Sequence, residues 1–294
     1  MLYDFSVFEK EKEEWERKTG RRAEKIGSSL CKRPLYQFRI GQGRRVFAVF
    51  ACFHGMEWIT SAVLMDYLRE SHWEETWKQA NTLVAVPMVN PDGVEISLHG
   101  AARAGRFAPL VRRISLDPIH WQANARGVDL NHNFPAGWEK LRRMEIRAGY
   151  TGPSPTRYGG EYAGSEPETE AVMQVCRQPG CERILALHSQ GEEIYYDAGL
   201  GTWKPGQKER AERLACAMEQ VSGYRAIPQP PGLASLGGCK DWFQLETGKP
   251  GFTVEMGKGE NPLPFSQKEA IQSHMFPLLN VFLEKEPVAK KSQV

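Results

Sequence analysis

The sequence lacks a strong excess of either charge, and it lacks any long apolar segment. Its 294 residues include 38 Lys and Arg and 36 Asp and Glu, which gives a formal net charge of +2. A balance this even provides no extended basic field for nucleic acid or for an acidic membrane surface. No run approaches the roughly 18 apolar residues of a membrane-spanning helix. We therefore expect neither a nucleic-acid partner nor a membrane segment.

The N-terminus also lacks the features of a secretory signal, and the cysteines lack a metal-binding spacing. Residues 1–20 carry charged side chains from the start and contain no apolar core segment, so we expect a cytoplasmic protein. A cytoplasmic setting argues against disulfides. No CxxC pair occurs, which argues against a structural zinc site made of thiolates. The six cysteines are Cys31, Cys52, Cys176, Cys181, Cys216 and Cys239.

Apolar periodicity predicts strands that alternate with helices. Strand-like patterns cover residues 35–40, 45–52, 83–89, 183–187 and 251–256, and helical patterns cover residues 5–19, 57–70, 166–178, 206–222 and 265–285. This alternation predicts an α/β fold whose sheet is covered on both faces. We expect a single domain over residues 1–294, with an N-terminal helical segment at 1–34 and a frayed tail at 286–294.

The segments between these elements carry more specific expectations. The turn Gly41-Gln42-Gly43 is expected to join the first two strands as a hairpin does, and Asn90-Pro91-Asp92-Gly93 is expected to form a turn. Residues 94–125 are mixed and basic, which indicates a long surface excursion. Residues 150–165 are rich in Gly, Pro, Ser and Tyr, which indicates a loop. Ser165 with Glu168 three positions later is typical of a helix capping box.

Two histidines and one glutamate stand at the ends of predicted strands. His54 and Glu57 are three positions apart where the strand 45–52 passes into the helix 57–70, and His188 follows the apolar string ILAL. In open α/β sheets, ligands collect at such strand ends. Two His and one Glu with an open fourth position form a known catalytic zinc set. The alternative is a histidine at a strand end and a glutamate in a first helical turn, where the helix dipole favours it.

An ordered series of further motifs resembles the zinc carboxypeptidase family. The family has HxxE followed by a distant third ligand His, and here 130 residues separate Glu57 from His188. The resemblance implies a central mixed, mostly parallel twisted sheet with helices on both faces, and one Zn²⁺ bound by His54, Glu57 and His188. The other matching motifs are Asn90-Pro91-Asp92-Gly93, Arg126-Gly127-Val128-Asp129-Leu130-Asn131, Gly238-Cys239-Lys240-Asp241-Trp242 and Phe252-Thr253-Val254-Glu255.

The same resemblance implies roles for three residues around the metal. Glu255 resembles the family's general base, which takes a proton from the attacking water and passes it to the leaving amine. Arg126 resembles the arginine that stabilises the tetrahedral oxyanion, a role that suits a guanidinium. Asn131 resembles the asparagine that helps bind the substrate carboxylate. Without the flanking motifs, Glu255 would be interpreted as a surface strand-end residue and Arg126 as a loop arginine in solvent.

The sequence departs from the family pattern at three positions. His132 stands where family exopeptidases have the arginine that binds the substrate C-terminus, and His cannot reproduce a bidentate pair with a carboxylate. The place of the family's mobile tyrosine falls near Leu233, and neither Tyr195 nor Tyr224 can be assigned to it. Lys240 stands at the floor of the pocket for the leaving residue, where it would favour a side chain with a carboxylate or would simply reach solvent.

One branch of the family matches these departures. The strings at residues 124–131, 134–138, 188–196 and 255–264 resemble the bacterial γ-D-glutamyl-meso-diaminopimelate peptidases, which cut peptidoglycan stem peptides. The side chain of diaminopimelate ends in a carboxylate, for which Lys240 is a candidate partner, and an ammonium, for which Glu192 or Glu193 is one. The resemblance implies a peptide substrate and a role in recycling the cell wall or in sporulation. Two alternatives stay open: a carboxypeptidase or deacylase for acidic substrates, and a zinc-binding pseudo-enzyme that serves as an interaction module.

Overall fold

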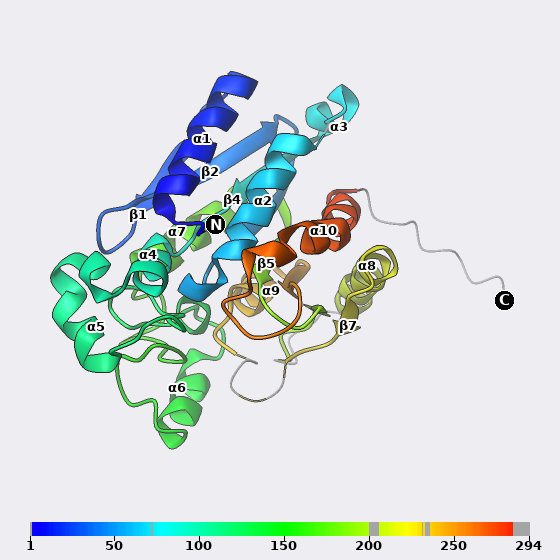
Figure 1. Ribbon diagram of the computed structural model, residues 1–294. Coiled ribbons are helices and arrows are strands. Elements are labelled where there is room, and N and C mark those ends of the chain that lie inside the picture. The colour runs from blue at the N-terminus through cyan, green and yellow to red at the C-terminus, as the bar shows by residue number, and fades with distance from the viewer. Residues whose placement is uncertain (1, 72, 200–205, 231, 233–235, 285–294) are drawn as a thin grey trace.

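The centre of the molecule is a twisted eight-stranded sheet (Figure 1). The computed structural model describes residues 2–71, 73–199, 206–230, 232 and 236–284, and within them the strand order is β1-β2-β4-β3-β5-β8-β6-β7. Four of the seven strand pairings are parallel and three are antiparallel, which confirms the mixed, mostly parallel sheet. The strands are β1 (Glu24–Ser28), β2 (Pro34–Gly41), β3 (Arg45–Ala51), β4 (Asn81–Val86), β5 (Cys181–His188), β6 (Glu193–Tyr195), β7 (Arg225–Ile227) and β8 (Gly251–Glu255).

Helices connect most of these strands. The α-helices of the described residues are α1 (Phe5–Thr19), α2 (Trp58–Glu70), α3 (Glu75–Ala80), α4 (Pro91–His99), α5 (Ala108–Ile114), α6 (Trp138–Arg147), α7 (Pro167–Cys176), α8 (Gln207–Ser222), α9 (Cys239–Thr247) and α10 (Lys268–Leu283). Short 3₁₀ turns are η1 (Gly55–Glu57), η2 (Ala101–Phe107), η3 (Leu130–His132) and η5 (Phe265–Gln267). None of the described helices combines the length and the apolar character that a bilayer crossing requires.

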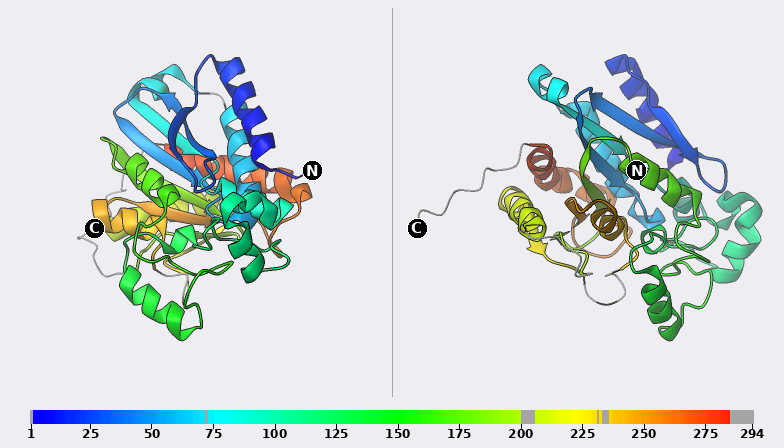
Figure 2. Two further views of the ribbon diagram at one scale, coloured as in Figure 1. Left: turned by 90° about the vertical axis from the view of Figure 1, so that its left-hand side faces the viewer. Right: turned by 180° about the vertical axis from the view of Figure 1, so that it is seen from behind.

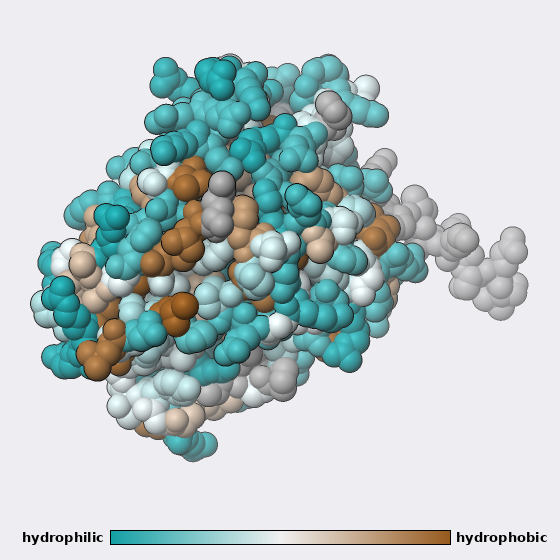
Figure 3. Space-filling model, in the orientation of Figure 1, coloured by the Kyte–Doolittle hydropathy of each residue, from teal (hydrophilic) through white to brown (hydrophobic). Residues whose placement is uncertain are grey.

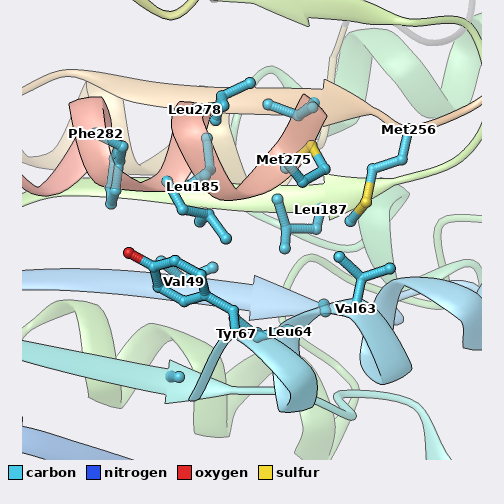
Figure 4. Close-up of a cluster of buried hydrophobic side chains, with 14 of the residues drawn as sticks. Val49, Val63, Leu64, Tyr67, Leu185, Leu187, Met256, Met275, Leu278 and Phe282 are labelled. Carbon is cyan, nitrogen blue, oxygen red and sulfur yellow. The ribbon is translucent and has the colours of Figure 1, made fainter. Parts of the chain in front are cut away.

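Each face of the sheet is covered by its own helices (Figure 2). Side chains of β3 alternate between two apolar clusters, with Phe47 and Val49 in one and Val46 and Ala48 in the other. The first cluster includes side chains of α1, α2, α8 and α10, and Figure 4 shows Val49 among residues of α2, β5 and α10. The second includes side chains of α7 and α9. Because both faces are buried, the central strands contain continuous apolar runs, residues 46–51 in β3 and 184–187 in β5.

Several expected features differ in the structure. The strands β2 and β3 do not form a hairpin, since β4 lies between them and pairs with both. The segment 1–34 is not wholly helical, because it contains β1 after α1. Asn90 is the N-cap of α4, and its side chain accepts a hydrogen bond from the Gly93 backbone. Glu166, not Ser165, is the N-cap residue of α7. The tail 286–294 lies outside the described residues.

Residues 94–125 also differ from the expected surface excursion. They form α4, η2 and α5 around a third apolar cluster, in which Ile96, Val111 and Trp121 are fully buried. The outer surface is nevertheless mostly hydrophilic in the view of Figure 3, with single hydrophobic residues scattered over it, as is normal for a globular protein.

Candidate metal centre and substrate cleft

The chain topology brings the predicted metal ligands to one edge of the sheet. β3 and β5 are parallel neighbours with Ala51 opposite Leu187, so the chain leaves both strands at the same end. His54 follows β3, and His188 is the last residue of β5. Glu57 closes the turn η1 directly after His54. Residues more than 130 positions apart therefore meet where ligands of open α/β sheets bind.

The ligand atoms of these three residues converge. The Nδ1 atoms of His54 and His188 are 3.3 Å apart, and the carboxylate of Glu57 lies 2.7 Å from the first and 3.1 Å from the second. A tetrahedral zinc with ligand bonds of about 2.0–2.1 Å holds its ligand atoms roughly 3.3 Å from one another. The spacing of the two imidazole nitrogens thus fits a cation placed between them, and this donor set is one that zinc uses in catalytic sites.

A further carboxylate orients one of the imidazoles. Asp129 Oδ1 lies 3.1 Å from His54 Nε2, which leaves His54 Nδ1 directed at the other ligands. Histidine ligands of metals usually donate their second ring nitrogen to such a carboxylate. On the opposite side, the Phe53 ring stacks on His188 with a centroid distance of 5.3 Å. Asp129 carried no assigned role in the sequence, although it stands two positions before Asn131 in a family motif.

The pKa values of Glu57 and Glu255 are shifted in opposite directions. Burial by itself raises the pKa of Glu57, but the His54 and His188 imidazoles lower it below its ordinary value. For Glu255, burial and the Glu57 carboxylate together raise the pKa well above its ordinary value. Glu255 lies beside His188 across the β5–β8 pairing. A carboxylate with a raised pKa next to a metal site is suited to act as a general base.

An open cleft of about 320 Å³ contains the converging ligands. Seven of the eight predicted site residues line it: His54, Glu57, Asn131, His132, His188, Lys240 and Glu255. It is also lined by residues to which the sequence analysis gave no role: Gln122, Asp129, Thr156, Arg157, Tyr195 and Asp241. Most of these lie on loops, where residue type alone carries little positional information.

Arg126 is the predicted residue that the structure places elsewhere. Its guanidinium contacts Glu166 at 2.9 and 3.0 Å and the Ser165 carbonyl at 3.3 Å, and it lines a separate hollow beside Tyr158. Glu166 is only 1% exposed, so breaking this pair would leave a buried carboxylate without its counter-charge. The role of oxyanion stabiliser expected for Arg126 therefore does not fit its position.

Asn131 and His132 line the cleft but are also held by other residues. The amide oxygen of Asn131 accepts a hydrogen bond of 3.0 Å from the Cys239 backbone at the start of α9. His132 Nδ1 lies 2.7 Å from the buried carboxylate of Glu145. That contact fixes the ring and leaves a single imidazole nitrogen for a ligand, which is a weaker anion site than a guanidinium.

Lys240 lies in the cleft wall and is not a solvent-directed lysine. Its side chain is 4% exposed, its Nζ donates to the Asp197 carbonyl at 2.7 Å, and it forms an ion pair with Asp241. A lysine ammonium has three donors, so these two contacts leave one for a ligand. The cleft thus presents a positive and a negative group side by side.

The other candidates for charge recognition, Glu192 and Glu193, do not line the cleft, although Glu193 is the neighbour of Glu255 across the β6–β8 pairing. Glu192 pairs with Lys258, and Glu193 pairs with Arg225 and accepts a hydrogen bond from Tyr195. Tyr195 does line the cleft, whereas the Tyr224 hydroxyl is bonded to the Gly257 backbone. Leu233, the position expected for the family's mobile tyrosine, lies outside the described residues.

Comparison with known proteins agrees with this geometry. The sequence profile of a family described as zinc carboxypeptidase matches residues 16–286. The chain is 35% identical over 273 residues to gamma-D-glutamyl-L-diamino acid endopeptidase 1 of Lysinibacillus sphaericus, which covers 88% of this chain and 65% of that protein. The chain therefore spans just under two thirds of this relative's length.

Solved structures share the fold. Carboxypeptidase A from Helicoverpa armigera superposes with a TM-score of 0.75 at 18% identity, over 96% of this chain and 72% of that one. The murein-tripeptide amidase from Escherichia coli O157 superposes with a TM-score of 0.59 at 22% identity, over 90% of this chain and 92% of that one.

Proposed function

The chain belongs to the zinc carboxypeptidase family, and from this premise we propose that it hydrolyses the γ-D-glutamyl–meso-diaminopimelate bond of peptidoglycan stem peptides. One zinc per chain would be held by His54, Glu57 and His188, whose ligand atoms lie within 4.8 Å of one another. When bound, zinc acidifies a water molecule and polarises a carbonyl. The Lysinibacillus relative is named as a gamma-D-glutamyl-L-diamino acid endopeptidase, which supports this substrate class.

The residues of the chain account for the proton transfers. Glu255 takes a proton from the water that attacks the γ-carbonyl carbon. As the C–N bond breaks, Glu255 passes that proton to the α-amine of the leaving diamino acid. Its place beside His188 puts it next to the metal ligands. The presence of this base argues against a pseudo-enzyme that only binds zinc.

The observation that carries the substrate proposal is the buried Lys240–Asp241 pair in the cleft wall. The far end of diaminopimelate carries both an ammonium and a carboxylate. The remaining donor of Lys240 suits the carboxylate, and Asp241 suits the ammonium. Lysine at the same position of the substrate would offer only an ammonium. Asp241 replaces Glu192 and Glu193 as the expected ammonium partner, because those two do not line the cleft.

The test compares two stem peptides that differ only in this head group. We expect the protein to cleave L-Ala-γ-D-Glu-meso-diaminopimelate faster than the L-lysine analogue, with the products identified by mass spectrometry and abolished by a chelator. Lys240→Met should reduce the preference by about tenfold, the value of one charge-assisted contact. A Lys240→Met/Asp241→Asn double variant avoids leaving Asp241 buried alone. Lys208→Met, which removes an exposed partner of Asp197, is the matched control.

The outcomes separate this proposal from the alternatives. An unchanged preference in both the single and the double variant would show that the pair does not recognise the substrate. Hydrolysis of ordinary acidic dipeptides, but not of the stem peptide, would indicate a carboxypeptidase or deacylase for acidic substrates instead. Together with this substrate, we propose a cytoplasmic role in the recycling of wall peptides. Fractionation of the source cells, followed by detection of the native protein in each fraction, tests this location.

A further inference from the structure

Arg157 lines the cleft from the loop at 150–165 and is tied to the metal centre through its own backbone. Its N–H donates to Asp129 Oδ2 at 2.9 Å, while Asp129 Oδ1 contacts His54 Nε2 at 3.1 Å. One carboxylate therefore fixes both the imidazole of a predicted metal ligand and the position of Arg157. The location of this arginine relative to the reacting carbonyl is set by the same residue that orients the metal site.

The backbone of Arg157 is held in an unfavourable conformation. Its φ angle is +63°, in the left-handed region that residues with a side chain rarely adopt. Backbone hydrogen bonds hold the loop on both sides of this position. The Gln122 N–H donates to the Pro155 carbonyl at 3.0 Å, and the Asp129 N–H donates to the Tyr158 carbonyl at 2.8 Å. Such conformations persist where surrounding contacts enforce them, and they concentrate at functional sites.

The guanidinium of Arg157 differs from the other basic side chains of the cleft in its contacts. Lys240 is paired with Asp241, and His132 is held by Glu145. Among the residues that the structure describes, the Arg157 side chain has neither a hydrogen-bond partner nor an ion-pair partner. A planar guanidinium in a cleft is suited to bind a carboxylate through two parallel hydrogen bonds.

We propose that Arg157 binds the free α-carboxylate of the γ-linked glutamyl residue, on the acyl side of the bond that is cut. This inference rests on the proposed function. A γ-glutamyl linkage uses the side-chain carboxyl and leaves the α-carboxylate free and ionised, whereas an α-linked peptide has no anion at that place. Arg157 is then a specificity-determining residue, which distinguishes γ-linked from α-linked substrates. The Lys240–Asp241 pair would recognise the other side of the bond.

The experiment crosses Arg157 variants with two substrates. One is L-Ala-γ-D-Glu-meso-diaminopimelate, and the other is the same peptide with the glutamyl α-carboxylate converted to a carboxamide. For the wild type we expect kcat/KM to fall about 10- to 100-fold on the carboxamide, the effect of losing one charge-assisted contact. Arg157→Gln should lose a similar factor on the carboxylate peptide and little on the carboxamide, and Arg157→Lys should lie between.

Controls keep the result interpretable. Arg113→Gln, at an exposed position on α5, should leave both rates unchanged, and zinc content and melting temperature should show that each variant is folded. An Arg157→Gln loss of equal size on both peptides, or no loss on either, overturns the proposal, because the arginine would then act on another group or on none. Failure of the wild type to cut either peptide overturns the proposed function itself, together with this inference.

Discussion

Two of the regions that bury carboxylates differ in access to the cleft, since the metal centre opens onto it and the other region does not. At the metal centre, Glu57 contacts two imidazoles and Asp129 contacts one. The second region, the Asp92 cluster, comprises Ser29, Arg33, Asp92 and Glu168, and lies between β1, α4 and α7. There Asp92 accepts hydrogen bonds from Ser29 at 2.7 Å and from Arg33 at 2.6 Å. Glu168 is fully buried and receives one bond, of 3.2 Å, from the Leu30 backbone.

One carboxyl group in each region has a strongly shifted pKa, and the shifts of Asp129 at the metal centre and of Glu168 in the Asp92 cluster are opposite. Burial by itself raises the pKa of Asp129, but His132 and His54 lower it far below its ordinary value. In the Asp92 cluster, burial and the Asp92 carboxylate raise the pKa of Glu168 to about 8. A raised pKa is often taken as a sign of a functional site. Glu168 and Glu255 both have one, and only Glu255 lines the cleft, so access to a ligand decides between function and structure.

The largest expected effect separates these two glutamates by activity. Glu255→Gln should lower kcat by about 10²- to 10⁴-fold, because it removes the proton acceptor while keeping the size of the side chain. Its zinc content, measured by mass spectrometry of the metal, should stay at the wild-type level. Glu168→Gln is the matched control, because Glu168 is buried and its pKa is also raised but it does not line the cleft, and the kcat of this variant should not change. Undiminished hydrolysis by the Glu255 variant would contradict the mechanism.

A smaller effect is expected from the carboxylate behind the metal ligand. Asp129→Asn should weaken zinc binding about 10- to 100-fold, because a neutral amide no longer orients and polarises His54. The amide nitrogen would also face the Arg157 backbone N–H, which donates to Asp129 in the wild type. Competition with a chromogenic chelator measures the affinity. Equal zinc affinities for the Asp129 variant and the Glu168→Gln control would remove the distinction between the two regions.

The sequence predicted most where residues suited to bind a metal stand next to the ends of predicted strands. His54 and His188 were predicted because each follows an apolar strand, and Glu57 because it stands three residues after His54, while the role of Glu255 came from the family resemblance. Parallel strands that end at one edge of the sheet bring such residues together. The alternation of strands and helices likewise predicted the covered sheet. Local patterns could not predict strand order, and for that reason the expected hairpin of β2 and β3 proved to have β4 inserted between its strands.

The cleft wall was less predictable because loops determine it. Arg126 and Arg157 are both loop arginines, and only contacts distant in sequence show that the first pairs with Glu166 while the second lines the cleft. Residues 150–165 have no apolar periodicity, so their sequence did not indicate that Arg157 faces the cleft. The third apolar cluster was missed for a related reason: its buried residues are dispersed among basic ones over residues 94–125, without a sustained helical or strand period.

The smallest effect concerns stability and tests the Asp92 cluster directly. The raised pKa keeps a proton on Glu168 in the native protein up to about pH 8, whereas the unfolded chain releases it near the ordinary glutamate pKa of 4.5. Between these values the unfolded state binds fewer protons, so this residue makes the wild type less stable as the pH rises. Glu168→Gln cannot ionise. Its free energy of unfolding should therefore match the wild type below about pH 4 and exceed it by about 2 to 4 kcal/mol at pH 8.

Urea unfolding of both proteins at a series of pH values measures this difference, and any contribution from the metal centre cancels because the two share it. Glu170→Gln on the same helix, where the side chain is 45% exposed, is the matched control and should give a curve parallel to that of the wild type. A parallel curve for Glu168→Gln as well would mean that Glu168 is ionised in the folded protein. Burial would then not keep Glu168 protonated, and its charge state would not distinguish it from Glu57 and Asp129 at the metal centre.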